Sequence, residues 1–164
     1  PLPQQKVYNK PFVYLDTAAS EQKPVQVLLK WEQLHNDYYG NIHRGAHYMA
    51  YKATVEYEEV RDKVKEFINA TSRKEIIFTK GTTESINLVA SSFCEKYVSD
   101  GDEIIVSEME HHSNIVPWQI AAERRNAKIV KLPFNDTGLL EMEKLPELIT
   151  PKTKLIAVNH LSNV

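Results

Sequence analysis

The feature that most constrains this chain is an alternation of short apolar runs with helical patterns, which begins near residue 75. Each apolar run has the length of a buried strand, and we predict strands at 75–79, 103–107, 128–132 and 154–158. The intervening segments carry apolar residues every three or four positions, and we predict helices at about 83–97, from 112 or 113, and at 141–149. Strands that alternate with helices build a mainly parallel sheet, so the predicted fold class is α/β.

The first half of the chain has a different pattern. Residues 1–12 contain three prolines and are predicted to form an extended arm, and residues 13–164 are predicted to form one domain. A short strand is expected at 13–15, a helix whose first turn holds Pro24, and a second helix at about 53–69. The segment 36–47 between these helices is rich in Tyr, Asn, His and Gly and is predicted to be a loop.

Composition excludes several classes of function. The net charge of −2 and the scattered basic residues argue against a nucleic-acid partner. The single cysteine, Cys94, lies in an apolar helical pattern and is predicted to be a buried thiol, which excludes an internal disulfide or a cysteine-rich zinc site. We find neither a long apolar run nor a signal peptide, so we expect no membrane partner and a cytoplasmic location.

A first candidate site lies where the strand at 75–79 meets the next helix. Gly81 allows close approach of a ligand to the backbone, and Thr82 and Thr83 add two hydroxyl donors. The free N–H groups at the start of a helix attract phosphate. The alternative is an ordinary threonine cap with no ligand.

A second candidate site follows the strand at 103–107. An imidazole such as that of His111 can stack on an aromatic ligand and transfer protons near neutral pH. A metal site would need His43 and His47 as further ligands, and the adjacent His111 and His112 would point in opposite directions on an extended segment, so we expect no metal. The structural alternative is a helix entry capped by Ser113 or Asn114, with His112 satisfying backbone groups.

Two further positions carry less local information. Asn163 follows the strand at 154–158, where its amide could contact a ring substituent or simply form a turn. His43 belongs to the loop at 36–47, which is either an ordinary surface loop or a segment that reaches an active site, including that of a second subunit.

Taken together, these segments resemble the class V aminotransferase group of fold-type-I pyridoxal 5'-phosphate enzymes. The similarity is greatest to the NifS-like cysteine desulfurases of the SUF type. The matching motifs include Tyr-Leu-Asp-Thr-Ala-Ala-Ser, Asn-Ile-His-Arg-Gly-Ala-His and Met-Glu-His-His-Ser-Asn-Ile-Val-Pro-Trp-Gln, and in order they occupy 14–20, 41–47, 77–90, 109–119 and 160–164.

The resemblance implies a role for each candidate residue. Gly81, Thr82 and Thr83 would hold the cofactor phosphate, His111 would stack on the pyridine ring and assist proton transfers, and Asn163 would bond the phenolic oxygen. A second group would belong to the substrate pocket, with His43 near the persulfide across a dimer interface: Ala18, Ala19 and His43.

The implied reaction takes sulfur from L-cysteine, releases L-alanine and leaves an enzyme persulfide that a sulfur-acceptor protein receives for iron–sulfur cluster assembly. In the family, the Schiff-base lysine and the catalytic cysteine lie beyond the residue equivalent to Val164. The sequence therefore resembles an N-terminal fragment, with an incomplete large domain, that is expected to be inactive alone and to belong to a homodimer when complete. The alternatives are a selenocysteine lyase acting on L-selenocysteine, another class V aminotransferase, and a non-catalytic phosphate-binding α/β module.

Overall fold

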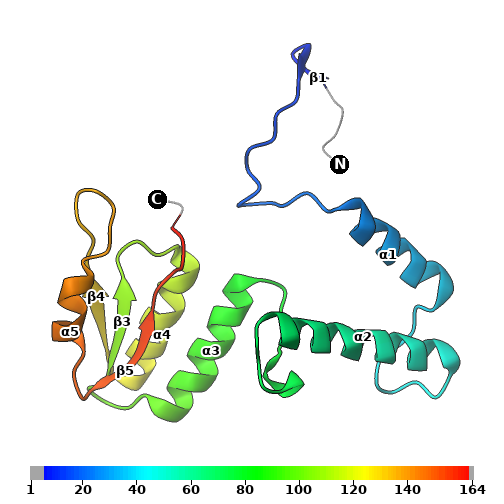
Figure 1. The fold of residues 1–164 in the computed structure, drawn as a ribbon. Helices are drawn as coiled ribbons and strands as arrows, with labels where there is room; N and C mark the ends of the chain where they lie inside the picture. The colour runs from blue at the N-terminus through cyan, green and yellow to red at the C-terminus, as the bar shows by residue number, and fades with distance from the viewer. Residues whose placement is uncertain (1–5, 163–164) are drawn as a thin grey trace. The chain divides into compact units, whose positions relative to one another are not determined.

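The computed structural model describes residues 6–162 of the chain (Figure 1). These residues form two compact units, the first ending at Ile77 and the second beginning at Phe78. In the part of the chain that the structure describes, no helix is both long and apolar enough to cross a membrane.

The first unit opens with a small antiparallel hairpin. Strands β1 (Lys6–Val7) and β2 (Lys10–Pro11) pair across Tyr8 and Asn9, which both have positive φ, as tight hairpin turns require. Part of the segment predicted to be an extended arm therefore folds back on itself. The strand predicted at 13–15 does not form, because no neighbouring strand pairs with it among the described residues.

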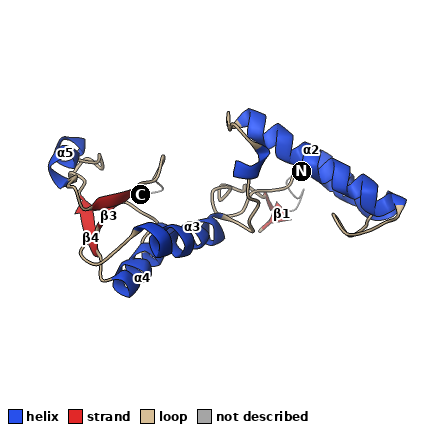
Figure 2. Cartoon of the chain, turned by 90° about the horizontal axis from the view of Figure 1, so that it is seen from below, coloured by secondary structure: helices blue, strands red, loops and turns tan. Residues whose placement is uncertain are grey.

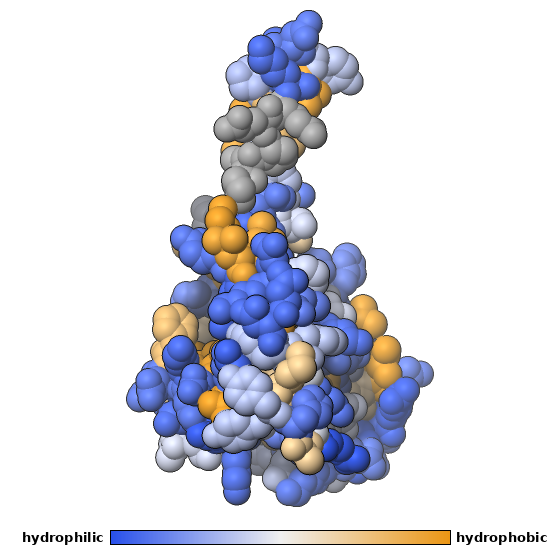
Figure 3. Space-filling view, turned by 90° about the vertical axis from the view of Figure 1, so that its right-hand side faces the viewer, coloured by the Kyte–Doolittle hydropathy of each residue, from blue (hydrophilic) through white to orange (hydrophobic). Residues whose placement is uncertain are grey.

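Two helices follow in the first unit. Helix α1 (Val25–Asp37) forms where a helix was predicted, but Pro24 caps it rather than lying in its first turn, and α1 buries none of its side chains. Figure 3 shows hydrophobic residues lying between hydrophilic ones on one face of the molecule. The exposed hydrophobic residues of α1 include Val27, Leu28 and Trp31.

Helix α2 (Tyr48–Phe67) begins five residues earlier than the sequence pattern predicted. The side chain of His47 caps this helix by accepting a hydrogen bond from the backbone N–H of Ala50 at 3.3 Å. The preceding loop lies tightly against Ala50, since a Cβ atom on Gly45 would lie 2.2 Å from the Ala50 Cβ. Glycine is therefore required at position 45 by close packing.

The prediction of a strand at 75–79 is wrong. A short 3₁₀ helix, η1 (Arg73–Glu75), occupies its start, where Ser72 and Glu75 form a capping box. Ile76 is extended, but residues 76–79 have no strand partner in the described chain. An apolar β-forming sequence becomes a strand only when a neighbouring strand satisfies its backbone groups.

The second unit contains a three-stranded parallel sheet with the order β4-β3-β5. The strands are β3 (Glu103–Ser107), β4 (Lys128–Leu132) and β5 (Thr153–Ala157), each within one residue of its prediction. The sheet, with its covering helices, confirms the predicted α/β class.

The helices of the second unit are α3 (Thr82–Tyr97), α4 (Val116–Arg125) and α5 (Leu145–Leu148). The helix predicted from residue 112 is split into a 3₁₀ turn, η2 (His112–Asn114), and α4, since Pro117 suits only the first turn of a helix. The helix predicted at 141–149 is likewise divided into η3 (Met142–Lys144) and α5, which has a proline in its first turn.

The core of the second unit lies between the sheet and the pair α3 and α4, which run side by side (Figure 2). Ile104 and Val106 of β3 pack here with Trp118 of α4 and with Cys94 of α3, which is buried as predicted. Because the three strands are parallel, the segments that follow them emerge at one edge of the sheet, and the segment after β3 carries His111.

Candidate functional site

The start of α3 is open to solvent and suited to an anion. No side chain caps this helix start, and a Cβ atom on Gly81 would meet nothing within 4 Å. The Glu84 carboxylate accepts a hydrogen bond from the backbone N–H of Lys80 at 2.6 Å, so its negative charge is engaged by a neighbouring backbone group. The backbone N–H groups at the helix start therefore face a hollow of about 410 Å³ lined by residues 80–84 and Asn87.

His111 lies at the carboxyl end of β3, in the segment that enters η2. Its Nδ1 atom accepts the backbone N–H of Ser113 at 3.1 Å and lies 2.9 Å from the Ser113 hydroxyl. A backbone N–H can only donate, so the neutral His111 ring carries its proton on Nε2. The cap of η2 is thus His111 itself, not Ser113 or Asn114 as the structural alternative had it, and this role leaves Nε2 available for proton transfer.

A second hollow, of about 340 Å³, brings His111 and the start of α3 together. Thr83 and Asn87 line it from α3, while His111, His112 and Ser113 line it from the segment after β3. Thr83 and Asn87 also line the first hollow, so the two hollows adjoin. An anion-binding helix start beside an imidazole could hold a planar molecule that carries a phosphate.

From the sequence, Asn87 was interpreted either as a helix-face residue or as a brace for the loops that follow the strands, and it was not predicted to line the cofactor site. Asn87 lies one helical turn after Thr83, and its Nδ2 donates to the Thr83 carbonyl oxygen at 2.8 Å. The i, i+4 spacing from Thr83 was the available signal, because that spacing puts two residues on one face of a helix.

The remaining site candidates fall in the first unit or outside the described residues. Ala18 and Ala19 are exposed in a turn at 17–19, where the Tyr14 hydroxyl lies 2.5 Å from the Ser20 carbonyl oxygen. Asn163 lies outside the described residues. The segment that leads to it is held beside the loop after β3, since the Ser162 hydroxyl donates to the Met109 carbonyl oxygen at 3.2 Å.

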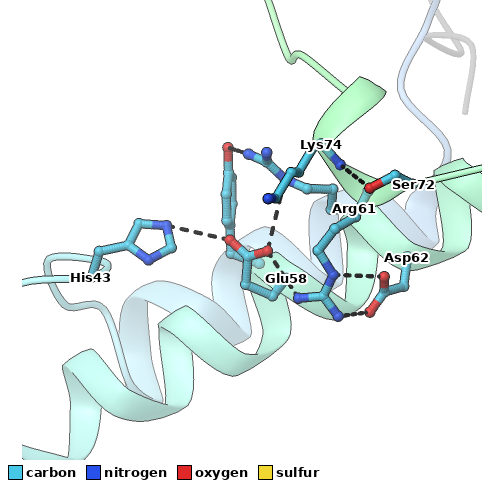
Figure 4. Close-up of polar contacts among 8 residues, drawn as sticks. His43, Glu58, Arg61, Asp62, Ser72 and Lys74 are labelled. Atoms are coloured by element: carbon cyan, nitrogen blue, oxygen red, sulfur yellow. Dashed lines mark hydrogen bonds and ion pairs between the residues drawn. The ribbon is translucent and has the colours of Figure 1, made fainter.

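His43 has defined partners on α2 (Figure 4). Its Nε2 lies 3.4 Å from a Glu58 carboxylate oxygen, its ring meets Tyr57 edge-on, and its backbone N–H donates to the Thr54 hydroxyl at 3.0 Å. Arg73 contacts the same Glu58 and also forms a bidentate pair with Asp62. The His43 ring is therefore oriented, with half of its side-chain surface exposed.

The described residues contain no group of three side chains that could hold a metal ion.

The family model described as Aminotransferase class-V matches residues 13–164. This chain belongs to the class-V aminotransferase family. Among its relatives, a probable cysteine desulfurase of Staphylococcus epidermidis is 48% identical over the whole of this chain. The chain spans 40% of the length of that relative.

Solved structures of similar fold agree with the family assignment. The cysteine desulfurase CsdA from Escherichia coli has 45% sequence identity and a TM-score of 0.79, over 92% of this chain and 38% of CsdA. A structure of SspA in complex with cysteine has 28% sequence identity and a TM-score of 0.80, over 92% of this chain and 42% of SspA. These similarities confirm the fold type predicted from the sequence.

Proposed function

We propose that this chain forms part of a pyridoxal-phosphate-dependent cysteine desulfurase that converts L-cysteine to L-alanine. The observation that carries the proposal is the pair of adjoining hollows that share Thr83 and Asn87. One has the character of a phosphate site and the other is lined by His111, as a phosphorylated pyridine would require. Relatives named cysteine desulfurases, at 45–49% identity, support the choice of substrate.

In this proposal the start of α3 binds the cofactor phosphate. Gly81, Thr82 and Thr83 offer backbone N–H groups, and the two threonines add hydroxyl donors. The open space in front of Gly81 fits a phosphate, since nothing within 4 Å of a Cβ atom there would obstruct it. Lys80, which also lines this hollow, adds a positive charge.

His111 then covers the pyridine ring and moves protons. Its Nδ1 atom is held by Ser113, so Nε2 is the atom that gives and takes a proton. Bound pyridoxal phosphate supplies the electron sink that makes a carbon–sulfur bond of cysteine labile. We assign Asn163 to the phenolic oxygen of the cofactor on the family resemblance alone.

The sulfur-accepting nucleophile is proposed to lie outside this chain. Cys94 is the only cysteine in the sequence; it is 1% exposed, and burial raises the pKa of its thiol, which disfavours a reactive thiolate. A polypeptide limited to these residues is therefore proposed to be inactive. We further propose that Ala18, Ala19 and His43 belong to the substrate pocket.

The wider setting follows from the same proposal. The complete enzyme is proposed to be a cytoplasmic homodimer that passes persulfide sulfur to an acceptor protein for iron–sulfur cluster assembly. The support for this setting is the family resemblance.

The test uses the protein that contains this chain, supplied with pyridoxal phosphate, L-cysteine and a thiol reductant. We expect equal amounts of alanine and sulfide, and a fall of about a hundredfold or more in the rate for His111→Gln. Folding of the variant is checked by circular dichroism. Absence of alanine from the wild-type protein, or an unchanged rate in His111→Gln, contradicts the proposal.

A further inference from the structure

We propose that Glu110 and Asn114 form a positioning pair that holds His111 at the edge of the sheet, an inference that rests on the proposed role of His111. The two residues flank the short turn that contains His111. Glu110 accepts hydrogen bonds from the Ser107 hydroxyl at 2.6 Å, from the Asn114 amide at 2.8 Å and from the backbone N–H of Asn159 at 2.7 Å. The pair therefore joins the end of β3, the turn η2 and the segment after β5.

The direction of each hydrogen bond in this network is determined by groups that can only donate. The indole Nε1–H of Trp118 donates to Asn114 Oδ1 at 2.8 Å. Asn114 must then present its Nδ2 to Glu110 Oε2, which has to accept. The backbone N–H of Asn159 likewise requires Glu110 Oε1 to accept. Both oxygens of position 110 must be acceptors, so a carboxylate satisfies the network and an amide does not.

The network anchors the His111 turn from outside. The hydrogen bonds of the His111 ring go to Ser113, within the same turn, so they orient the ring relative to the turn but not to the sheet. Asn114 ties the turn to Trp118, which is 4% exposed and part of the core, and Glu110 ties it to Asn159. Loss of these bonds is therefore expected to displace the imidazole rather than to unfold the unit.

The test exchanges the amide and the carboxylate. In Glu110→Gln the NH₂ group of the introduced glutamine would face the NH₂ group of Asn114, which breaks the network. In the double variant Glu110→Gln, Asn114→Asp, the aspartate accepts from Trp118 and from the introduced glutamine amide, while the glutamine oxygen accepts from Ser107 and Asn159. The exchange keeps the net charge of the wild-type protein and restores every bond.

Three quantities are measured on the protein that contains this chain: exchange of the Trp118 indole N–H, the ring NMR signals of His111, and the apparent Kd for added pyridoxal phosphate. The Trp118 indole signal is assigned by its loss from the spectrum of a Trp118→Phe variant. We expect Glu110→Gln to speed indole exchange about tenfold, to shift the His111 signals and to raise the Kd about fivefold or more. The double variant should return all three close to wild type.

Glu108→Gln is the matched control, because it makes the same charge change two residues away. Glu108 pairs at 3.3 Å with Lys131 on the surface and takes no part in the network, so no change beyond about twofold in the Kd is expected. Should the double variant not fold, Glu110→Gln is repeated in a Trp118→Phe background. There Asn114 is free to turn its oxygen toward the glutamine, and the effect of Glu110→Gln on the His111 signals should become small.

The outcomes separate this inference from the proposed function. Unchanged His111 signals in Glu110→Gln, or a persistent defect in both rescue experiments, overturns the positioning role whatever the cofactor affinity. Failure of the wild-type protein to bind pyridoxal phosphate overturns the proposed function instead, while the NMR measurements still decide whether the pair positions His111.

Discussion

Replacing Tyr38 by phenylalanine is expected to loosen α1 from α2 in the first unit. Tyr38 follows α1 directly and is fully buried, whereas α1 itself buries no side chain. The Tyr38 hydroxyl donates to Glu56 of α2 at 2.6 Å and accepts from Lys30 of α1 at 2.7 Å. This hydroxyl is therefore a principal polar tie between the two helices.

The magnitude follows from the bond to the Glu56 carboxylate. A hydrogen bond to a charged group contributes about 1.5–3 kcal/mol net, and phenylalanine keeps the ring in place without making that bond. The exposed Lys30 still reaches Glu56 at 2.9 Å in the variant, so we expect the loss to stay near the lower end, at about 2 kcal/mol. An opening equilibrium for α1 should rise about 30-fold.

Amide hydrogen exchange of α1 measures this opening directly, and the amide of Tyr38, which donates to the Leu34 carbonyl oxygen, reports on its end. The matched control is Tyr39→Phe, because Tyr39 is 64% exposed and should lose less than about 0.5 kcal/mol. Equal exchange rates in Tyr38→Phe and Tyr39→Phe would refute the reasoning.

Three further predictions concern other groups. The pKa of Glu56 is lowered below its usual 4.5, chiefly by the hydrogen bond from Tyr38 and next by the one from Lys30. The ionised Glu56 carboxylate therefore stabilises the fold above pH 4.5, and this stabilisation is lost as the pH falls through the lowered pKa. The difference in unfolding free energy between wild type and Glu56→Gln should accordingly narrow at acid pH. Cys94, whose thiol pKa is raised by burial, should be alkylated by iodoacetamide at pH 8 far more slowly in folded than in urea-unfolded protein, as mass spectrometry can show; equal rates would contradict its burial. Gly45→Ala should lower the urea midpoint by the equivalent of about 1–3 kcal/mol through overlap with Ala50, and an unchanged midpoint would be inconsistent with the close packing.

The sequence predicted the elements whose signals are local. The strands at 103–107 and 128–132 have the predicted bounds, because an apolar β-branched run between polar ends marks a buried strand. The start of α3 was placed within one residue of its position, from Gly81 and the two threonines that follow it.

The misses depend on partners that are distant in sequence or on single side chains. The run at 75–79 looks like a strand but has no partner in the described chain, and pairing cannot be read from the run itself. Helix α2 starts early because His47 caps it, which a hydrophobic period does not reveal. In the site, His111 was predicted from its place after a strand, whereas Glu110 gains its role from Asn159, 49 residues away.

The central claim is that the start of α3 and the hollow beside His111 are two halves of one site for a phosphorylated pyridine. The most direct measurement follows the backbone amide signals of residues 81–84 and the His111 ring signals by NMR as pyridoxal phosphate is added to the protein that contains this chain. The account predicts that both sets shift together with a single affinity, and that inorganic phosphate shifts only residues 81–84. Shifts of the His111 ring without those of the helix start, or of neither, would contradict it.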